Sequence, residues 1–256
     1  MSDIKKNRMF MQCPSFKESM EKSDQQNNIP HPTYEREITG DFTTLPPFDD
    51  AVICPSYLDL LEQRRSVRTY LDKPLTKKQL AFMLWSAGSI QQYRGKNQMA
   101  TLRPVPSGGA RHPFELYLVA RDVEGLEPGL YRYAPIKNVG EKKVTIERLG
   151  SLFDNYDTKM SDLLVGQKWA TKAPVVLFVS CIPYRAEWRY NDLAHRVMLI
   201  DLGHIGQNMM LSATALGLGS CLMAAYDQKI CDEVFSFDGV EEYTVYALSL
   251  GYFEQA

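Results

Sequence analysis

The stretch Arg64-Arg65-Ser66-Val67-Arg68 places three guanidinium groups and one hydroxyl within five residues. It follows a short segment, residues 56–63, whose apolar side chains recur at helical spacing. Guanidinium groups bind phosphate through paired hydrogen bonds, and a serine hydroxyl adds a further donor. The cluster can therefore hold a dianionic phosphate. Arginines at a solvated helix end, where they complement the helix dipole, would give the same pattern.

Composition limits the classes of protein to which this chain can belong. Of the 256 residues, 45% are hydrophobic and 23% are charged, as in an ordinary soluble globular protein. The net charge of −2 does not indicate a nucleic-acid partner. Five scattered cysteines without a C-x-x-C pair indicate neither a disulfide framework nor a zinc site, so we expect no metal.

Targeting and membrane signals are also weak. No apolar segment typical of a signal peptide follows the first residues, Met1 to Lys6. The most apolar run, residues 197–218, is interrupted by Asp201, His204 and other polar residues, so it predicts a buried helix rather than a membrane span. We therefore expect a cytoplasmic protein without membrane association.

The pattern of polar and apolar residues divides the chain near residue 54. Residues 1–54 are polar and rich in proline and lack apolar periodicity, which predicts an extended arm that is partly disordered at its start. Residues 55–256 carry the apolar patterns of regular elements and form the folded domain. Predicted helices cover 56–63, 76–88, 151–165 and 191–216; predicted strands cover 114–121, 129–133, 144–148, 175–180 and 244–250; a loop covers 89–106 and a turn 221–226.

Two of these elements carry specific signals. Thr76 and Gln79 have the spacing of a capping box at the start of the second helix. The long helix, 191–216, has many small residues, which indicates close packing against another helix, either in this chain or in a second copy. No G-x-G-x-x-G follows a strand and no steady βαβ alternation occurs, so a Rossmann fold is disfavoured.

The loop Pro106-Ser107-Gly108-Gly109 is a second candidate binding feature. Two adjacent glycines allow backbone amides to approach a flat ligand closely. A tight surface turn before the strand at 114–121 would explain the same residues without a ligand.

Four stretches in order resemble the FMN-dependent nitroreductase superfamily, and in particular its branch of SagB-type dehydrogenases and azoline oxidases. They are Arg64-Arg65-Ser66-Val67-Arg68, the run 103–110 that contains the glycine loop, Gly125-Leu126-Glu127-Pro128-Gly129-Leu130-Tyr131-Arg132-Tyr133, and the helical run 195–220. The resemblance covers about residues 55–252 and favours phosphate binding by the arginine cluster.

The resemblance implies an α+β fold, nitroreductase-like, with a mainly antiparallel central sheet flanked by helices. It also implies an intimate homodimer with FMN at the subunit interface. In such a site Arg68, near the pyrimidine edge, would stabilise the negative charge of the reduced flavin. The implied cofactor-binding residues are Arg64, Arg65, Ser66 and Arg68 for the phosphate, ribityl chain and pyrimidine edge; Pro106, Ser107, Gly108 and Gly109 from the other subunit; and Met223, Ala224 and Ala225 near flavin N5. Core packing after a helix would also explain Met223.

The implied activity is ping-pong hydride transfer, in which NAD(P)H reduces FMN and a small acceptor such as a nitroaromatic or quinone then takes the electrons. The alternative is a SagB-like flavin dehydrogenase subunit of a peptide-modifying, azoline-oxidising complex. Azoline oxidases of this branch carry a Lys-Tyr pair before the long helix, where this chain has Trp188-Arg189-Tyr190. Tyr190 and Arg189 are candidate catalytic residues, but arginine is a poor base, so azoline oxidation is not expected.

Overall fold

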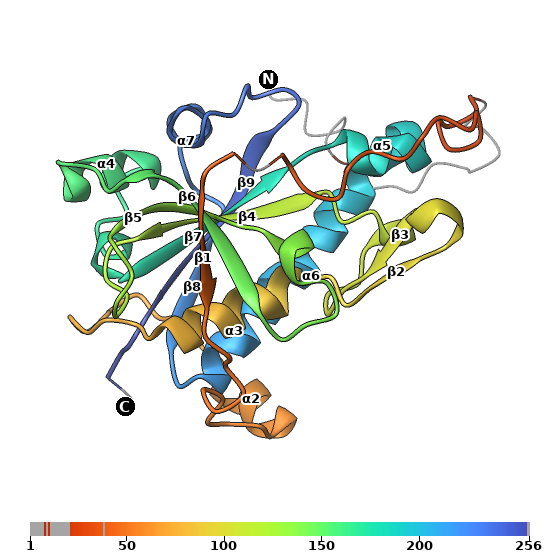
Figure 1. The fold of residues 1–256 in the computed structure, drawn as a ribbon. Coiled ribbons are helices and arrows are strands. Elements are labelled where there is room, and N and C mark those ends of the chain that lie inside the picture. The colour runs from red at the N-terminus through yellow and green to blue at the C-terminus, as the bar shows by residue number, and fades with distance from the viewer. Residues whose placement is uncertain (1–7, 9, 11–20, 38, 255–256) are drawn as a thin grey trace.

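The computed structural model describes residues 8, 10, 21–37 and 39–254 (Figure 1). The strands are β1 (Asp41–Leu45), β2 (Gln92–Arg94), β3 (Ala100–Leu102), β4 (Phe114–Ala120), β5 (Gly129–Tyr133), β6 (Val144–Ser151), β7 (Val175–Cys181), β8 (Gly219–Met223) and β9 (Tyr243–Gly251). The α-helices are α2 (Tyr57–Gln63), α3 (Lys77–Gly88), α4 (Tyr156–Leu163), α5 (Tyr184–Tyr190), α6 (Ala194–Ala215) and α7 (Gln228–Phe235), and short 3-10 turns include η2 (Gly108–Ala110) and η4 (Ala170–Lys172).

Seven strands form one sheet in the order β1-β6-β5-β4-β7-β9-β8, and every neighbouring pair is antiparallel. Strands β2 and β3 pair separately as a hairpin. The α+β class with a mainly antiparallel central sheet is therefore confirmed. Among the described residues, none of the helices is both long and apolar enough to serve as a membrane span.

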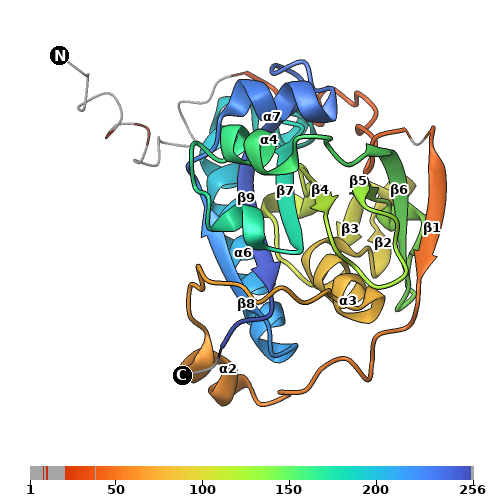
Figure 2. The same ribbon diagram turned by 90° about the vertical axis from the view of Figure 1, so that its left-hand side faces the viewer.

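The central strands β4 and β7 are buried on both faces, because helices pack on each side of the sheet (Figure 2). Leu116 and Leu118 of β4 point into a core shared with α3 and α6. Tyr117 and Val119 point the opposite way, into a core shared with α4 and α7. This confirms the strand predicted at 114–121, and both sets of its alternating side chains are buried.

Helix α3 begins at the predicted capping box. The Thr76 hydroxyl accepts a hydrogen bond from the Gln79 N–H at 3.2 Å, and the Gln79 side chain accepts one from the Thr76 N–H at 2.9 Å. Two N–H groups that the helix leaves unpaired are thereby satisfied. The cap fixes where α3 starts along the sheet.

The small residues of α6 allow close contact with two neighbours, helix α3 and the sheet. Ser212 donates a hydrogen bond to Ser86 of α3 at 2.8 Å, so the two helices are in close contact. A Cβ on Gly206 would lie 2.9 Å from Leu222 and 3.1 Å from Tyr246, so this glycine lets α6 approach the sheet. A Cβ on Gly203 would meet nothing within 4 Å. Packing against a second copy through this helix stays a prediction.

Several short elements differ from the sequence-based expectation. The prediction of a turn at 221–226 is wrong for residues 221–223, because residues 219–223 pair with β9 as strand β8. The expected loop at 89–106 contains the hairpin β2–β3. The long helix starts at Ala194 rather than Asn191, whose φ of 45° lies outside the helical region, and the separate helix α5 precedes it. Elements this short owe their form to cross-strand and tertiary contacts, which leave little periodicity in the sequence.

Part of the predicted arm belongs to the sheet. Strand β1 pairs with β6 at the sheet edge, which the lack of apolar periodicity did not predict. Glu147 holds the chain just before β1, since its carboxylate accepts hydrogen bonds from the N–H groups of Thr39 and Gly40 at 2.9 and 2.7 Å. The expected disorder falls mostly on 1–7, 9 and 11–20, outside the described residues.

A buried ionic network anchors the arm to the sheet. Arg132 bridges Glu115 and Glu147 at 3.5 and 2.9 Å, and Arg185 pairs with Glu115 at 2.6 Å. Glu35 of the arm lies against the same network, 4% exposed, and one of its oxygens accepts a hydrogen bond from the Ile136 N–H at 2.7 Å. The other oxygen of Glu35 is buried without a hydrogen-bond partner. Burial, together with the nearby charge of Glu115, raises the pKa of Glu35 from 4.5 to about 7.

This pKa predicts that Glu35 makes stability fall as the pH rises. The folded state holds the proton more tightly than the unfolded state, so the contribution is full below pH 4.5 and is lost as the pH rises through about 7. The loss is on the order of 3 kcal/mol. In Glu35→Gln this dependence disappears, so urea denaturation should show the variant gaining stability relative to the wild type between pH 5 and pH 8. The exposed Glu124→Gln is the control, and an equal wild-type-to-E35Q difference at both pH values would contradict the prediction.

Candidate functional site

The arginine segment lies along the edge of the sheet. Helix α2 ends where the Arg64 N–H donates to the Leu60 carbonyl at 3.0 Å. The chain then runs beside β8, with a parallel bridge between Ser66 and Ser220 and a hydrogen bond from the Val67 N–H to the Ser220 carbonyl at 2.9 Å. The segment is therefore extended and fixed by backbone pairing, rather than a continuation of a solvated helix.

The charges of this segment are not neutralised within the described chain. Arg65, Ser66 and Arg68 are exposed, and Arg64 is half-buried. None of the three arginines forms an ion pair with a carboxylate among the described residues, whereas arginines 36, 121, 132, 148 and 185 all do. Cations held on a fixed backbone without counter-charges suit an anionic ligand.

The turn at residues 166–169 connects the arginine segment with the end of β8. The Arg68 guanidinium lies 5.7 Å from the centre of the Trp169 ring. In the same turn, the Gln167 side chain donates a hydrogen bond to the Ala225 carbonyl at 2.8 Å. Met223 is buried in the core, while Ala224 and Ala225 are exposed beyond the strand. The arginine segment and the Met223–Ala225 segment thus flank one turn.

The glycine loop is held by an acidic side chain of α6. The Asp201 carboxylate accepts a hydrogen bond from the Ser107 hydroxyl at 2.6 Å and one from the Gly108 N–H at 3.0 to 3.1 Å. Asp201 is 5% exposed, and burial raises its pKa while the bonds from Ser107 and Gly108 oppose the rise. The Ser107 hydroxyl also accepts from the His112 N–H at 2.9 Å.

The two glycines of this loop lie against the end of α5 and the start of α6. Gly109 has a φ of 57°, and a Cβ there would lie 2.6 Å from Arg189 and 2.7 Å from the Tyr190 hydroxyl. A Cβ on Gly108 would overlap the Val197 side chain. The structure therefore brings the candidate catalytic residues Arg189 and Tyr190 onto the glycine loop.

The glycine loop and the segment that precedes α2 contact α6 at different points along its length. Asp201, which holds the loop, is 14 residues from Ala215, whose carbonyl accepts hydrogen bonds from Ile53 and Cys54 just before α2. At 1.5 Å per residue this is about 21 Å. Among the described residues no hydrogen bond or ion pair joins the glycine loop to the arginine segment.

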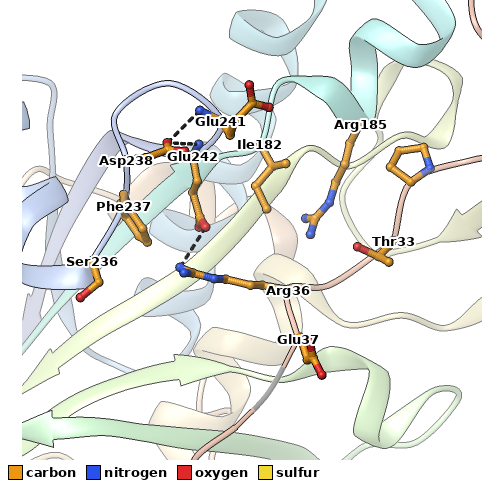
Figure 3. Close-up of a pocket in the computed structure, with 11 residues that line it drawn as sticks. Thr33, Arg36, Glu37, Ile182, Arg185, Ser236, Phe237, Asp238, Glu241 and Glu242 are labelled. Carbon is orange, nitrogen blue, oxygen red and sulfur yellow. Dashed lines mark hydrogen bonds and ion pairs between the residues drawn. The ribbon is translucent and has the colours of Figure 1, made fainter.

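A pocket of about 380 Å³ lies away from both groups, between the arm and the turn before β9 (Figure 3). Figure 3 shows Arg36 pointing across it to Glu242, with which it pairs at 3.2 Å. Asp238 accepts three backbone N–H groups of its own turn, from residues 240, 241 and 242. Arg36, Glu242 and Asp238 are thus already partnered within the chain. None of the predicted site residues lines this pocket. Among the described residues no three His, Cys, Asp or Glu side chains are grouped to hold a metal ion.

Sequence reasoning missed Asp201, Gln167 and Trp169. The only sign of Asp201 was an acidic residue within a strongly apolar helical run. Gln167 and Trp169 carry no local pattern, because their proximity to the site follows from how the turn after α4 meets β8.

Comparisons with known proteins identify the class. The profile of the Nitroreductase family matches residues 61–252. The chain therefore belongs to the nitroreductase family.

Relatives of two kinds are similar to this chain. The nitroreductase-like protein MJ1384 of Methanocaldococcus jannaschii is 32% identical over 193 residues, which are 75% of this chain and 89% of that protein. The microcin B17-processing protein McbC of Escherichia coli is 27% identical over 53% of this chain and 49% of its own length. A chain in the structure of the E. coli microcin synthetase McbBCD complex has the same fold, with a TM-score of 0.58 at 18% identity, covering 98% of this chain and 92% of that one.

The packing of the glycine loop predicts that Gly108→Ala is destabilising. The Cβ of the new alanine would overlap Val197, whose β-branched side chain has little rotational freedom on a helix. We expect a loss of about 1–3 kcal/mol in urea denaturation, as for overpacked sites. The control is Gly150→Ala in β6, where the nearest atom to a Cβ would be 3.9 Å away and stability should hold or rise. Equal stability changes in the two variants would contradict the described loop packing.

Proposed function

We propose that this nitroreductase-family chain is an FMN-dependent oxidoreductase that uses NAD(P)H to reduce a small acceptor such as a nitroaromatic or quinone. The observation that carries the proposal is the arginine segment, whose three cations have no carboxylate partner among the described residues. Membership in the family adds to it.

The residues of the arginine segment fit the phosphate of FMN. Arg64, Arg65 and Arg68 supply positive charge, and Ser66 supplies a hydroxyl donor on the same stretch. Hydrogen bonds to charged groups contribute about 1.5–3 kcal/mol each, so a dianionic phosphate would be held firmly. A Cβ on Gly219 would lie 2.7 Å from Val67, so this glycine leaves room for the segment to lie close against β8.

FMN, when bound, supplies the two-electron chemistry, and the chain supplies charge, orientation and shielding from water. Arg68 is the group suited to stabilise negative charge at the pyrimidine edge, since its guanidinium is exposed and is packed beside Trp169. The exposed Ala224 and Ala225, which follow β8, would place their backbone near N5 of the flavin. Tyr190, with Arg189 beside it, would offer a phenol proton and a positive charge to the acceptor.

The proposal includes a homodimer, since among the described residues no hydrogen bond or ion pair joins the glycine loop to the arginine segment of the same chain. A flavin held by the arginine segment of one copy would meet the Pro106–Gly109 loop of the other. Exposed apolar side chains offer the contact surface: Tyr57 and Leu58 of α2 are 66% and 64% exposed, and Leu199 and Ile200 of α6 are 54% and 47% exposed. Apolar area of this kind is stabilised when a partner covers it.

A second candidate function is that of a flavin-binding subunit in a peptide-modifying complex. The similarity to the microcin B17-processing protein favours it. Arg189 counts against azoline oxidation in such a complex, because a guanidinium is not deprotonated at ordinary pH and cannot serve as the base. Partner contacts would then matter more than turnover by the isolated chain.

The proposal predicts that Arg68→Ala weakens FMN binding. Loss of one charge-assisted contact should raise the dissociation constant for FMN roughly 10- to 100-fold. Fluorescence titration of the apo-protein measures this change directly. The control is Arg148→Ala on β6, five strand positions from β8 in the sheet and so roughly 24 Å away. Wild-type affinity in Arg68→Ala would remove the support for the proposed cofactor site.

Arg189 stands where azoline oxidases of the resembling branch have a lysine. We therefore predict that the isolated protein does not oxidise azoline peptides. The reduction of a nitro or quinone acceptor by NADH or NADPH should proceed in the same preparation. Mass spectrometry of an azoline-containing peptide, incubated with the FMN-loaded protein and oxygen, checks the first expectation. Loss of two hydrogens from the peptide at a catalytic rate would instead support the peptide-modifying function.

A further inference from the structure

Asp201 is an acidic residue on the apolar helix α6, and its carboxylate is turned toward the glycine loop. Its hydrogen-bond donors on the loop are the Ser107 hydroxyl and the Gly108 N–H, at 2.6 and 3.0 to 3.1 Å. No lysine or arginine among the described residues pairs with it. A buried carboxylate costs free energy unless it is hydrogen-bonded, and the hydrogen bonds of Asp201 go to the glycine loop. Core packing alone therefore does not account for Asp201.

Asp201 also determines which donors of the loop stay available. The Ala110 N–H donates to the Ser107 carbonyl at 2.9 Å, and the Gly108 N–H and the Ser107 hydroxyl are used by Asp201. The Gly109 N–H has no hydrogen-bond partner among the described residues. Gly109 is also the residue that has a positive φ and lies against the Tyr190 hydroxyl. The carboxylate thus holds the loop in a shape that leaves one backbone donor for a ligand.

We propose that Asp201 is a positioning residue that fixes the Ser107–Gly109 backbone against the flavin held by the arginine segment of a second copy of this chain. This inference rests on the proposed FMN function. Asp201 acts through the loop and does not itself contact the flavin. Among the described residues no hydrogen bond or ion pair joins the loop to the arginine segment of its own chain, and the proposal places the effect of Asp201 on the partner's cofactor.

The first test compares Asp201→Asn with Asp162→Asn, an exposed aspartate on α4. The asparagine keeps the size of the side chain but loses the charge and one acceptor. Titration of the apo-proteins with FMN should give a dissociation constant at least 10-fold higher for Asp201→Asn and an unchanged one for Asp162→Asn. Wild-type FMN affinity in Asp201→Asn overturns the inference. Failure of the wild type itself to bind FMN would overturn the proposed function as well, so the two failures are distinguishable.

The second test places the two defects on different chains. Arg68→Ala and Asp201→Asn chains carrying different affinity tags are co-expressed, and the mixed dimers are isolated through both tags. If Asp201 acts across the interface, one site of each mixed dimer carries both defects and the other carries none. About one FMN per mixed dimer is then expected, against little FMN in either parent homodimer. A mixed dimer with as little FMN as its parents shows that Asp201 acts within its own chain and overturns the inference.

A structural defect is separated from a positioning defect by the same mixed dimer. A chain whose fold is damaged cannot present an intact arginine segment, so restored FMN binding excludes that explanation. If Asp201→Asn does not yield folded protein, Ser107→Ala takes its place, because it removes one loop partner of Asp201 and leaves the carboxylate. Ser107→Ala should weaken FMN binding and be restored in the mixed dimer in the same way, and unchanged binding would overturn the inference.

Discussion

The pairing of the arginine segment with strand β8 is the constraint on which the rest of this structure depends. The hydrogen bond from Val67 to Ser220 holds an extended, cationic stretch at the edge of a seven-stranded antiparallel sheet. The close approach at Gly219 keeps this stretch tight against the strand. Three arginines are consequently carried on a fixed backbone without carboxylates among the described residues to neutralise them, and an anion is the ligand that this arrangement favours.

Helix α6 determines how the remaining parts relate to that stretch. Its C-terminal end leads into β8 beside the arginines, while Asp201 near its other end holds the glycine loop against Arg189 and Tyr190. In the proposed site the glycine loop of one copy would face the arginine segment of another, and the exposed apolar residues of α2 and α6 would give those copies a surface to share.

The sequence predicted the long, strongly patterned elements well, because burial of β4, β7 and α6 imposes regular spacing on many residues. It also predicted the capping box at Thr76, which depends on two side chains three residues apart. Strand β8 was missed because it depends on pairing with the distant strand β9, and the β2–β3 hairpin was missed because strands of three residues are too short to show alternation. For the site, the motifs named the arginines and the loop, but the role of Asp201 required the contact between residues 94 positions apart.

The central claim is that a phosphate-bearing flavin is shared between two copies of this chain. Native mass spectrometry of the purified protein with added FMN tests it most directly, because the method reports subunit number and bound flavin together. The account predicts one main species that contains two chains and two FMN molecules. A single chain that retains FMN, or a protein of any size that retains none, would contradict it.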